Sequence, residues 1–164
     1  MLWVEIAMSL ALTSTAFVDD GTIPQQFTCD GSNVSPALTW SGAPANTRTF
    51  ALIADDPDAP AGTFVHWVLF NVPGNATALP ENVAREETLA SLGNAAQGRN
   101  DFRKIGYGGP CPPPGKPHRY FFKLYALDTA LVLHPGATKA QVEAAMQGHI
   151  VATAQLVGSY ARKR

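Results

Sequence analysis

Apolar residues dominate three segments of the chain, and each segment is enclosed by proline and glycine. The segments are residues 50–54, 66–72 and 119–127, and the turns around them read DPDAPAG, VPGN and GGPCPPPGKP. Runs of this length, rich in aromatic and β-favouring residues and bounded by turn formers, are typical of β-strands. Because polar residues do not alternate regularly within them, the pattern predicts central strands that are covered on both faces.

Weaker signals complete the predicted secondary structure. Further strands are expected at residues 10–17, 38–40 and 155–160. Thr138 and Gln141 have the spacing of a capping box, and apolar positions recur behind them at helical intervals, so an amphipathic helix is expected to begin there and to end near Gly148. A second, shorter helix is expected between residues 84 and 92.

Many strands with one or two short peripheral helices predict an all-β fold. The antiparallel sheets of such a fold form a sandwich or a barrel. No linker or internal repeat divides the chain, so we expect residues 1–164 to form one domain, with residues 1–7 as a loose N-terminal extension.

The charge balance excludes several classes of function. The 164 residues carry 12 Lys and Arg against 13 Asp and Glu, a net charge of −1, so no basic field is present to attract nucleic acid or acidic membranes. High apolar content with low net charge also excludes a disordered chain. No apolar stretch reaches the roughly 18 residues that a membrane-spanning helix requires.

Targeting and redox signals favour the cytoplasm. The apolar N-terminus contains Glu5 and has no Lys or Arg before Arg48, so it lacks the cationic region of a signal peptide. The two cysteines, Cys29 and Cys111, have no CxxC spacing and are too few for a disulfide framework. They can form one disulfide or remain two partly buried thiols, and the residues do not decide between these states.

An acidic turn follows the first buried strand directly, in the order Asp55, Asp56, Pro57, Asp58, Ala59 and Pro60. Alternate residues of an extended segment point the same way, so Asp56 and Asp58 are expected to share a side. The Ala59–Pro60 bond is a candidate cis peptide. Two carboxylates on a stiff loop can orient histidines, bind a metal or tune acid–base chemistry, and the structural alternative is a solvated acidic turn.

Two histidines begin strands beside rigid loops. His66 follows the acidic turn, and His118 follows the proline-rich loop. His118 and Tyr120 are two residues apart in a strand, so they are expected to face the same side. A charged imidazole donates from both ring nitrogens and suits an anion such as phosphate, although lone histidines are often purely structural. His134 and His149 have no such context and are interpreted as structural.

The segment from Gly106 to Gly115 reads GYGGPCPPPG and is the most unusual stretch of the chain. Its prolines fix extended backbone, whereas Gly108 and Gly109 can adopt positive φ and turn their N–H groups inward as an anion-binding nest. No Lys-Ser or Lys-Thr follows, so the segment is not a nucleotide-binding phosphate loop. The structural alternative is a rigid crossover.

Three ordered motifs resemble the phosphatidylethanolamine-binding protein family, also called Raf kinase inhibitor protein-like, and in particular its bacterial and archaeal branch. They are DDPDAP at 55–60, GTFVHWVLFNVP at 62–73 and YGGPCPPPGKPHRYFFKLYALD at 107–128, and segments 27–40 and 137–160 are also similar to that branch. The resemblance implies a Greek-key antiparallel β-sandwich with a small anion pocket at one end. By motif, the implied pocket residues are Asp56, Asp58, His66, Gly109, Pro112, His118 and Tyr120.

The residues and the resemblance together predict a non-catalytic module that binds phosphate or a phosphoryl headgroup without a cofactor or metal. His66 and His118 are expected to donate to the anion, and the aspartates to orient them and favour their charged state. Anion affinity should then fall as pH rises through the histidine pKa values. The alternatives are a small-molecule hydrolase and a metal site built from the same carboxylates and histidines.

The resemblance implies further partners and two departures from the family. A regulatory or inhibitory role toward a protein such as a kinase or a protease is expected, with no target identified by the residues. Mammalian members have another helix after the final strand, whereas this chain ends four residues after Tyr160. That difference implies a more open pocket, or one that a homodimer covers. Val65 stands before His66, where mammalian members have a second histidine.

Overall fold

The structure, a computed structural model, describes residues 9–163, and these residues form two β-sheets, one α-helix and two 3-10 helices. The predicted extension at residues 1–7 lies outside the described residues. The strands are β1 (Ala11–Thr13), β2 (Gly21–Thr22), β3 (Leu38–Ser41), β4 (Thr49–Asp56), β5 (Phe64–Pro73), β6 (Ala78–Leu79), β7 (Thr88–Leu89), β8 (Ala95–Gln97), β9 (His118–Leu127) and β10 (Ile150–Tyr160). The helices are η1 (Gln25–Phe27), η2 (Ala90–Leu92) and α1 (Lys139–Met146).

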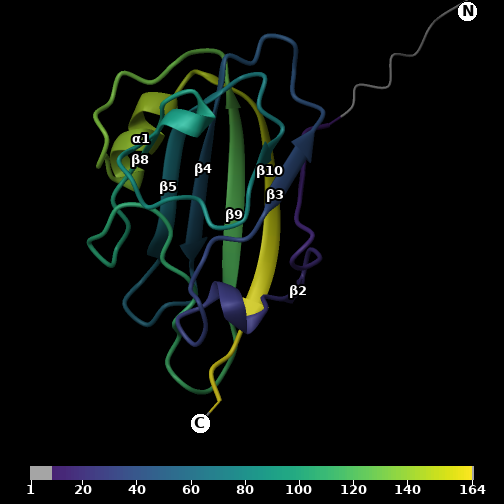
Figure 1. Ribbon diagram of the computed structural model, residues 1–164, viewed down its shortest axis with the longest axis vertical. Coiled ribbons are helices and arrows are strands. Elements are labelled where there is room, and N and C mark those ends of the chain that lie inside the picture. The colour runs from purple at the N-terminus through teal and green to yellow at the C-terminus, as the bar shows by residue number, and fades with distance from the viewer. Residues whose placement is uncertain (1–8, 164) are drawn as a thin grey trace, which may run out of the picture.

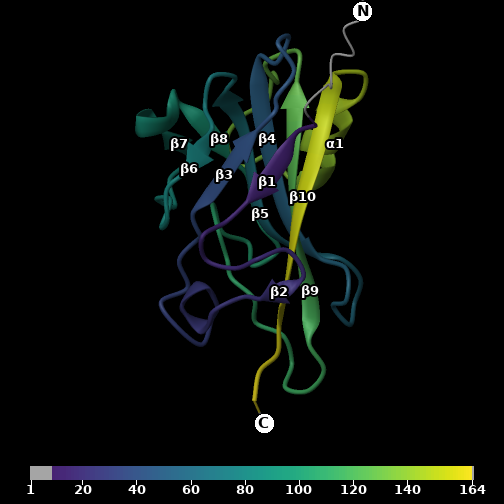
Figure 2. The same ribbon diagram turned by 90° about the vertical axis from the view of Figure 1, so that its right-hand side faces the viewer.

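The strands form a large and a small sheet. The large sheet has the order β2–β10–β9–β4–β5–β8–β7, and Figure 1 shows its long strands side by side. The small sheet has the order β1–β3–β6 and is seen against the large one in Figure 2. Most of the described pairings are antiparallel, but β2 pairs parallel with β10. A mostly β fold is confirmed, whereas the expectation of purely antiparallel sheets is wrong at this edge, where no hairpin fixes the direction of β2.

Alternate residues of β4 face two different hydrophobic cores. Phe50 and Leu52 belong to the core that residues of β1, β3 and β6 close from the opposite side. Ala51 and Ile53 belong to a second core on the other face, where α1 contributes Val142. All residues of β4 are buried. The predicted coverage on both faces is therefore confirmed for β4 and most of β5, and it explains why their sequences do not alternate, whereas one face of β9 is only half-buried.

The predicted helix near Thr138 is confirmed, whereas the short helix predicted between residues 84 and 92 is reduced to the 3-10 turn η2 at its end. Thr138 Oγ1 accepts from the N–H of Gln141, and the side chain of Gln141 accepts from the N–H of Thr138, which completes the capping box. The rest of residues 84–92 holds β7 and no α-helix. Thr88 and Leu89 pair with β8, and Leu89 is buried in the larger core, so tertiary pairing overrides the local helical preference.

The capping box makes a modest contribution to stability that can be measured. Thr138→Ala removes the acceptor for the N–H of Gln141 and should lower the free energy of unfolding by about 1 kcal/mol in urea denaturation. Thr138→Ser keeps the hydroxyl and should retain most of this free energy. Equal losses in the two variants would show that the side chain acts through something other than its cap.

Candidate functional site

The ends of three neighbouring strands bring predicted site residues together at one end of the large sheet. Strand β4 ends at Asp56, and its antiparallel neighbours β5 and β9 begin at Phe64 and His118. In an antiparallel pair the end of one strand lies beside the beginning of the next. The acidic turn, His66 and His118 therefore meet, although they are far apart in the sequence.

A β-bulge in β5 sets the position of His66. Two consecutive residues of β4, Ala54 and Asp55, pair with Trp67 and Val65 of β5, so His66 is an extra residue without a partner in this ladder. Bulges at sheet ends redirect side chains. The imidazole lies among aromatic rings, one of which comes from β9.

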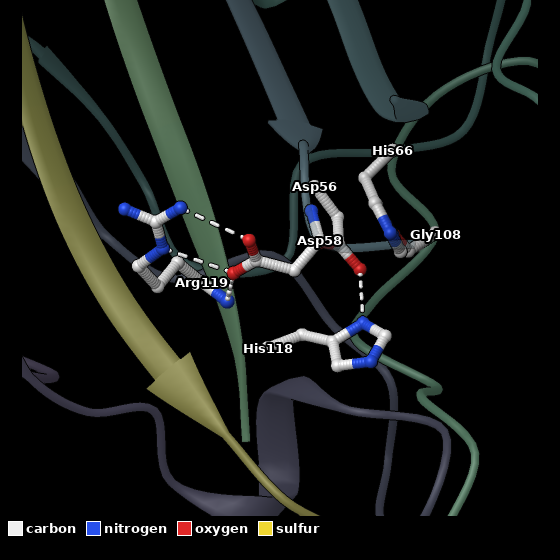
Figure 3. Close-up of polar contacts among 6 residues, drawn as sticks. All are labelled: Asp56, Asp58, His66, Gly108, His118 and Arg119. Atoms are coloured by element: carbon white, nitrogen blue, oxygen red, sulfur yellow. Dashed lines mark hydrogen bonds and ion pairs between the residues drawn. The ribbon is translucent and has the colours of Figure 1, made fainter. Parts of the chain in front are cut away.

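The buried Asp56 and the half-buried His118 form a hydrogen-bonded pair, shown in Figure 3. His118 Nδ1 donates to Asp56 Oδ2 over 2.7 Å, and the two side chains are 12% and 4% exposed. Asp56 Oδ1 accepts from the N–H of Asp58 over 2.7 Å and so closes the turn after β4. Because the carboxylate orients the ring through Nδ1, Nε2 is the atom that His118 can offer to a ligand.

Asp58 points away from this pair, toward Arg119 (Figure 3). Its carboxylate accepts from Nε and Nη2 of Arg119, each over 2.9 Å. The hydrogen bonds with Arg119 lower the pKa of Asp58 to about 2. The expectation that Asp56 and Asp58 share a side is therefore wrong, because the turn that Asp56 caps redirects the chain between them.

The ring of His66 is held differently from that of His118. Its Nδ1 lies 2.6 Å from the carbonyl oxygen of Gly108. Burial lowers the pKa of His66 below its ordinary value, although the Gly108 carbonyl and the carboxylate of Asp56 act in the opposite direction. The expectation that nearby aspartates keep both imidazoles charged is thus wrong for His66, because desolvation outweighs the carboxylate.

The two glycines of the proline-rich loop do not form a nest. Neither Gly108 nor Gly109 has a positive φ. The N–H of Gly108 donates to the carbonyl of His66 over 2.9 Å, and that of Gly109 donates to Asn33 Oδ1 over 2.8 Å. Glycine is required here for close approach, since a Cβ on Gly109 would lie 2.3 Å from the carbonyl oxygen of Phe27.

A disulfide fastens this loop to the segment around η1. Cys29 and Cys111 are bonded, which decides the alternative that the sequence left open. The N–H of Cys29 also donates to the carbonyl of Pro110 over 3.0 Å, and Tyr107 Oη donates to the carbonyl of Phe27 over 2.6 Å. The loop is therefore cross-linked to the segment around η1 and held against it.

This cross-linked loop, the acidic turn and the strand ends enclose a cavity of about 170 Å³. Sites for drug-sized ligands measure roughly 300–1,000 Å³, so this one suits a ligand the size of a headgroup. Its lining consists of Asp56, Ala59, Pro60, Phe64, His66, Phe102, Cys111, Pro112, Pro113, His118 and Tyr120.

Five of the seven predicted site residues line this cavity: Asp56, His66, Pro112, His118 and Tyr120. Asp58 is paired with Arg119, and Gly109 lines a neighbouring cavity of about 370 Å³. The Ala59–Pro60 bond is trans, so the cis expectation is wrong. Sequence reasoning missed the rings of Phe64 and Phe102, because a single aromatic residue beside or within a loop carries no local signal of a cavity.

One fully buried polar atom of the cavity lining is left without a partner. The hydroxyl of Tyr120 is buried and makes no hydrogen bond within residues 9–163. Burial, followed by the charge of Asp56, raises the pKa of Tyr120, so the hydroxyl stays protonated and remains a donor. A buried hydroxyl without a partner costs roughly 1–3 kcal/mol, which a ligand oxygen could recover.

Metal binding and membrane spanning would each place a requirement on the described part of the chain. No group of three or more His, Cys, Asp or Glu side chains there is arranged to hold a metal ion. None of its helices is both long enough and apolar enough to span a membrane.

Comparisons with known proteins match nearly the whole chain. The model of the phosphatidylethanolamine-binding protein family matches residues 13–161. A protein of Methanothermobacter thermautotrophicus, described as a UPF0098 protein, is 52% identical over 151 residues, which cover 92% of this chain and 98% of the relative.

Solved structures agree with the sequence matches. The crystal structure of Escherichia coli YbcL, described as a new member of the mammalian family, gives a TM-score of 0.88 at 36% identity and covers 94% of this chain and 99% of that one. The homologue CT736 from Chlamydia trachomatis gives a TM-score of 0.86 at 38% identity and covers 95% of this chain and 99% of that one.

Proposed function

Because the chain belongs to the phosphatidylethanolamine-binding protein family, we propose that it is a non-catalytic module that binds a small phosphorylated anion in the cavity beside Asp56 and His118. The Greek-key β-sandwich of the resemblance is part of this proposal. The two sheets that share the larger core support it, because they face each other across that core.

The single observation that carries the proposal is the buried hydroxyl of Tyr120. It is a donor without a partner within residues 9–163. Tyr120 lines the same cavity as His118, whose Nε2 is not used by the bond to Asp56. Hydrogen bonds to charged acceptors are stronger than those between neutral groups. An anionic oxygen in the cavity would therefore gain more from this hydroxyl than water or a neutral ligand would.

Titration with inorganic phosphate tests the proposal. Tyr120→Phe removes the hydroxyl and keeps the ring, so phosphate affinity should fall at least about tenfold, and His118→Ala should cause a similar loss. The matched control is Tyr125→Phe, on the same strand but outside the cavity lining, which should leave affinity unchanged. Equal affinities in the wild type, Tyr120→Phe and His118→Ala, measured by calorimetry, would refute the proposal.

A hydrolase is the second candidate function, and the Asp56–His118 pair favours it, because a carboxylate-oriented imidazole can act as a general base. Cys111 cannot serve as its nucleophile while it is in the disulfide, and the lining contains no Ser, Thr or Lys. Hydrolysis would thus require attack by water. Turnover in an ester and phosphoester screen that disappears in His118→Ala would establish this activity.

Three further expectations belong to this proposal. A role toward a kinase or protease, a homodimer and a cytoplasmic location remain predictions. The Cys29–Cys111 disulfide bears on location, because disulfides persist in oxidising compartments and in the intracellular proteins of hyperthermophiles. Thiol labelling of Cys29 and Cys111 in freshly lysed cells, combined with fractionation, tests the location directly.

A further inference from the structure

The hydrogen bond between His66 and Gly108 fixes where the imidazole carries its proton. Nδ1 of His66 lies 2.6 Å from the carbonyl oxygen of Gly108, and a carbonyl can only accept. The hydrogen is therefore on Nδ1 in both charge states. A neutral His66 then has its lone pair on Nε2, and its residue lines the cavity.

The surroundings of His66 favour the neutral form of its ring. The residue is 4% exposed and packs against the rings of Phe64, Phe102 and Tyr120. The ionisable groups around it come from each neighbouring element: Asp56 from the end of β4, Asp101 from the loop after β8, and Tyr120 and His118 from β9.

The two nearby carboxylates are already engaged. Asp56 accepts from His118, and Asp101 Oδ2 accepts from the N–H of Val65 over 2.7 Å. Desolvation consequently dominates and lowers the pKa of His66. A ligand therefore meets an acceptor at Nε2 of His66 and a donor at the hydroxyl of Tyr120.

This pairing of an acceptor with a donor restricts the ligand. It must bring an oxygen that accepts from Tyr120 and a hydroxyl that donates to His66. The lining contains no Lys or Arg, the guanidinium of the adjacent Arg119 is held by Asp58, and the imidazole of His118 is paired with Asp56, so no unpaired cation in the lining balances a second negative charge. A singly charged ligand is favoured for the same reason.

Building on the proposed function, we propose that the cavity selects phosphate monoesters in their singly protonated, monoanionic form over phosphodiesters. A monoester monoanion carries both the accepting oxygens and the P–OH donor. A diester anion has no hydroxyl and would leave Nε2 of His66 buried without a partner. The natural ligand is accordingly a soluble phosphate monoester and not the diester headgroup of an intact phospholipid.

Methyl phosphate and dimethyl phosphate test the selection. Methyl phosphate carries an ionisable P–OH group that dimethyl phosphate lacks, and the two differ little in size. Titration by calorimetry at pH 6 should give at least about tenfold tighter binding of methyl phosphate. The second pKa of a phosphate monoester is about 6, so its monoanion becomes roughly tenfold scarcer from pH 7 to pH 8. From pH 7 to pH 8, the ratio of the methyl phosphate affinity to the dimethyl phosphate affinity should fall by nearly that factor. Protein groups whose titration affects both ligands equally do not change this ratio.

His66→Asn is the matched variant. Its side-chain amide can still donate to the carbonyl of Gly108, but it offers nothing at the position of Nε2, so the preference for methyl phosphate should disappear. O-phosphoethanolamine and glycerophosphoethanolamine, a monoester and a diester of one headgroup, should reproduce the wild-type preference.

The outcomes separate this inference from the proposed function. Binding of both esters with equal affinity and no pH-dependent ratio overturns the selection and leaves anion binding intact. Binding of neither ester, nor of inorganic phosphate, overturns the proposed function itself. A preference that persists in His66→Asn overturns the role of His66.

Discussion

Replacement of both cysteines by serine should lower the free energy of unfolding by about 4.5 kcal/mol, the largest effect expected of any variant considered for this protein. The Cys29–Cys111 bond joins residues 82 positions apart, and the entropy that a cross-link removes from the unfolded chain grows with the length of the closed loop. Urea denaturation of the oxidised wild type and the double variant measures the difference.

Reduction provides the control for this prediction. The chain has only two cysteines, so a reducing agent acts on no other disulfide, and the reduced wild type should unfold at nearly the same urea concentration as the double variant. Phosphate affinity should also fall in both forms, because Cys111 lines the cavity. Identical midpoints for the oxidised and reduced wild type would contradict the prediction.

Gly109→Ala should lower the free energy of unfolding by about 3 kcal/mol. A Cβ at this position would lie 2.3 Å from the carbonyl oxygen of Phe27 and 2.4 Å from Asn33 Oδ1. The disulfide and the hydrogen bond from the N–H of Cys29 to the carbonyl of Pro110 hold the proline-rich loop against the segment around η1. The backbone at Gly109 therefore cannot move away without breaking these bonds. Chemical denaturation measures the loss.

Gly108→Ala is the matched comparison, and its effect should fall on binding more than on stability. The new Cβ would lie 2.4 Å from the ring of Phe102, which is 38% exposed and can rotate toward solvent. We expect a loss of about 1 kcal/mol in unfolding free energy and a clear loss of phosphate affinity, because Phe102 lines the cavity and packs on His66. A greater loss of stability in Gly108→Ala than in Gly109→Ala would contradict this ordering.

The long elements of the fold could be predicted because their signals are local. Strands β4, β5 and β9 are apolar runs between turn formers, and the helix begins with a complete capping box. The short strands β6, β7 and β8 have only two or three residues each, so no period can be recognised in them. Their pairing depends on a sheet that already exists.

By itself, the sequence predicted five of the side chains that meet at the end of the large sheet. Asp56, His66, Pro112, His118 and Tyr120 line one cavity because they lie at strand ends or in the rigid loop between them. Only the tertiary structure decided what each group does there. Arg119 engages Asp58 from 61 positions away, and Gly108 fixes the proton of His66 from 42 positions away. Charge state and hydrogen-bond partner depend on burial and on residues remote in the chain, and neither is encoded in a local pattern.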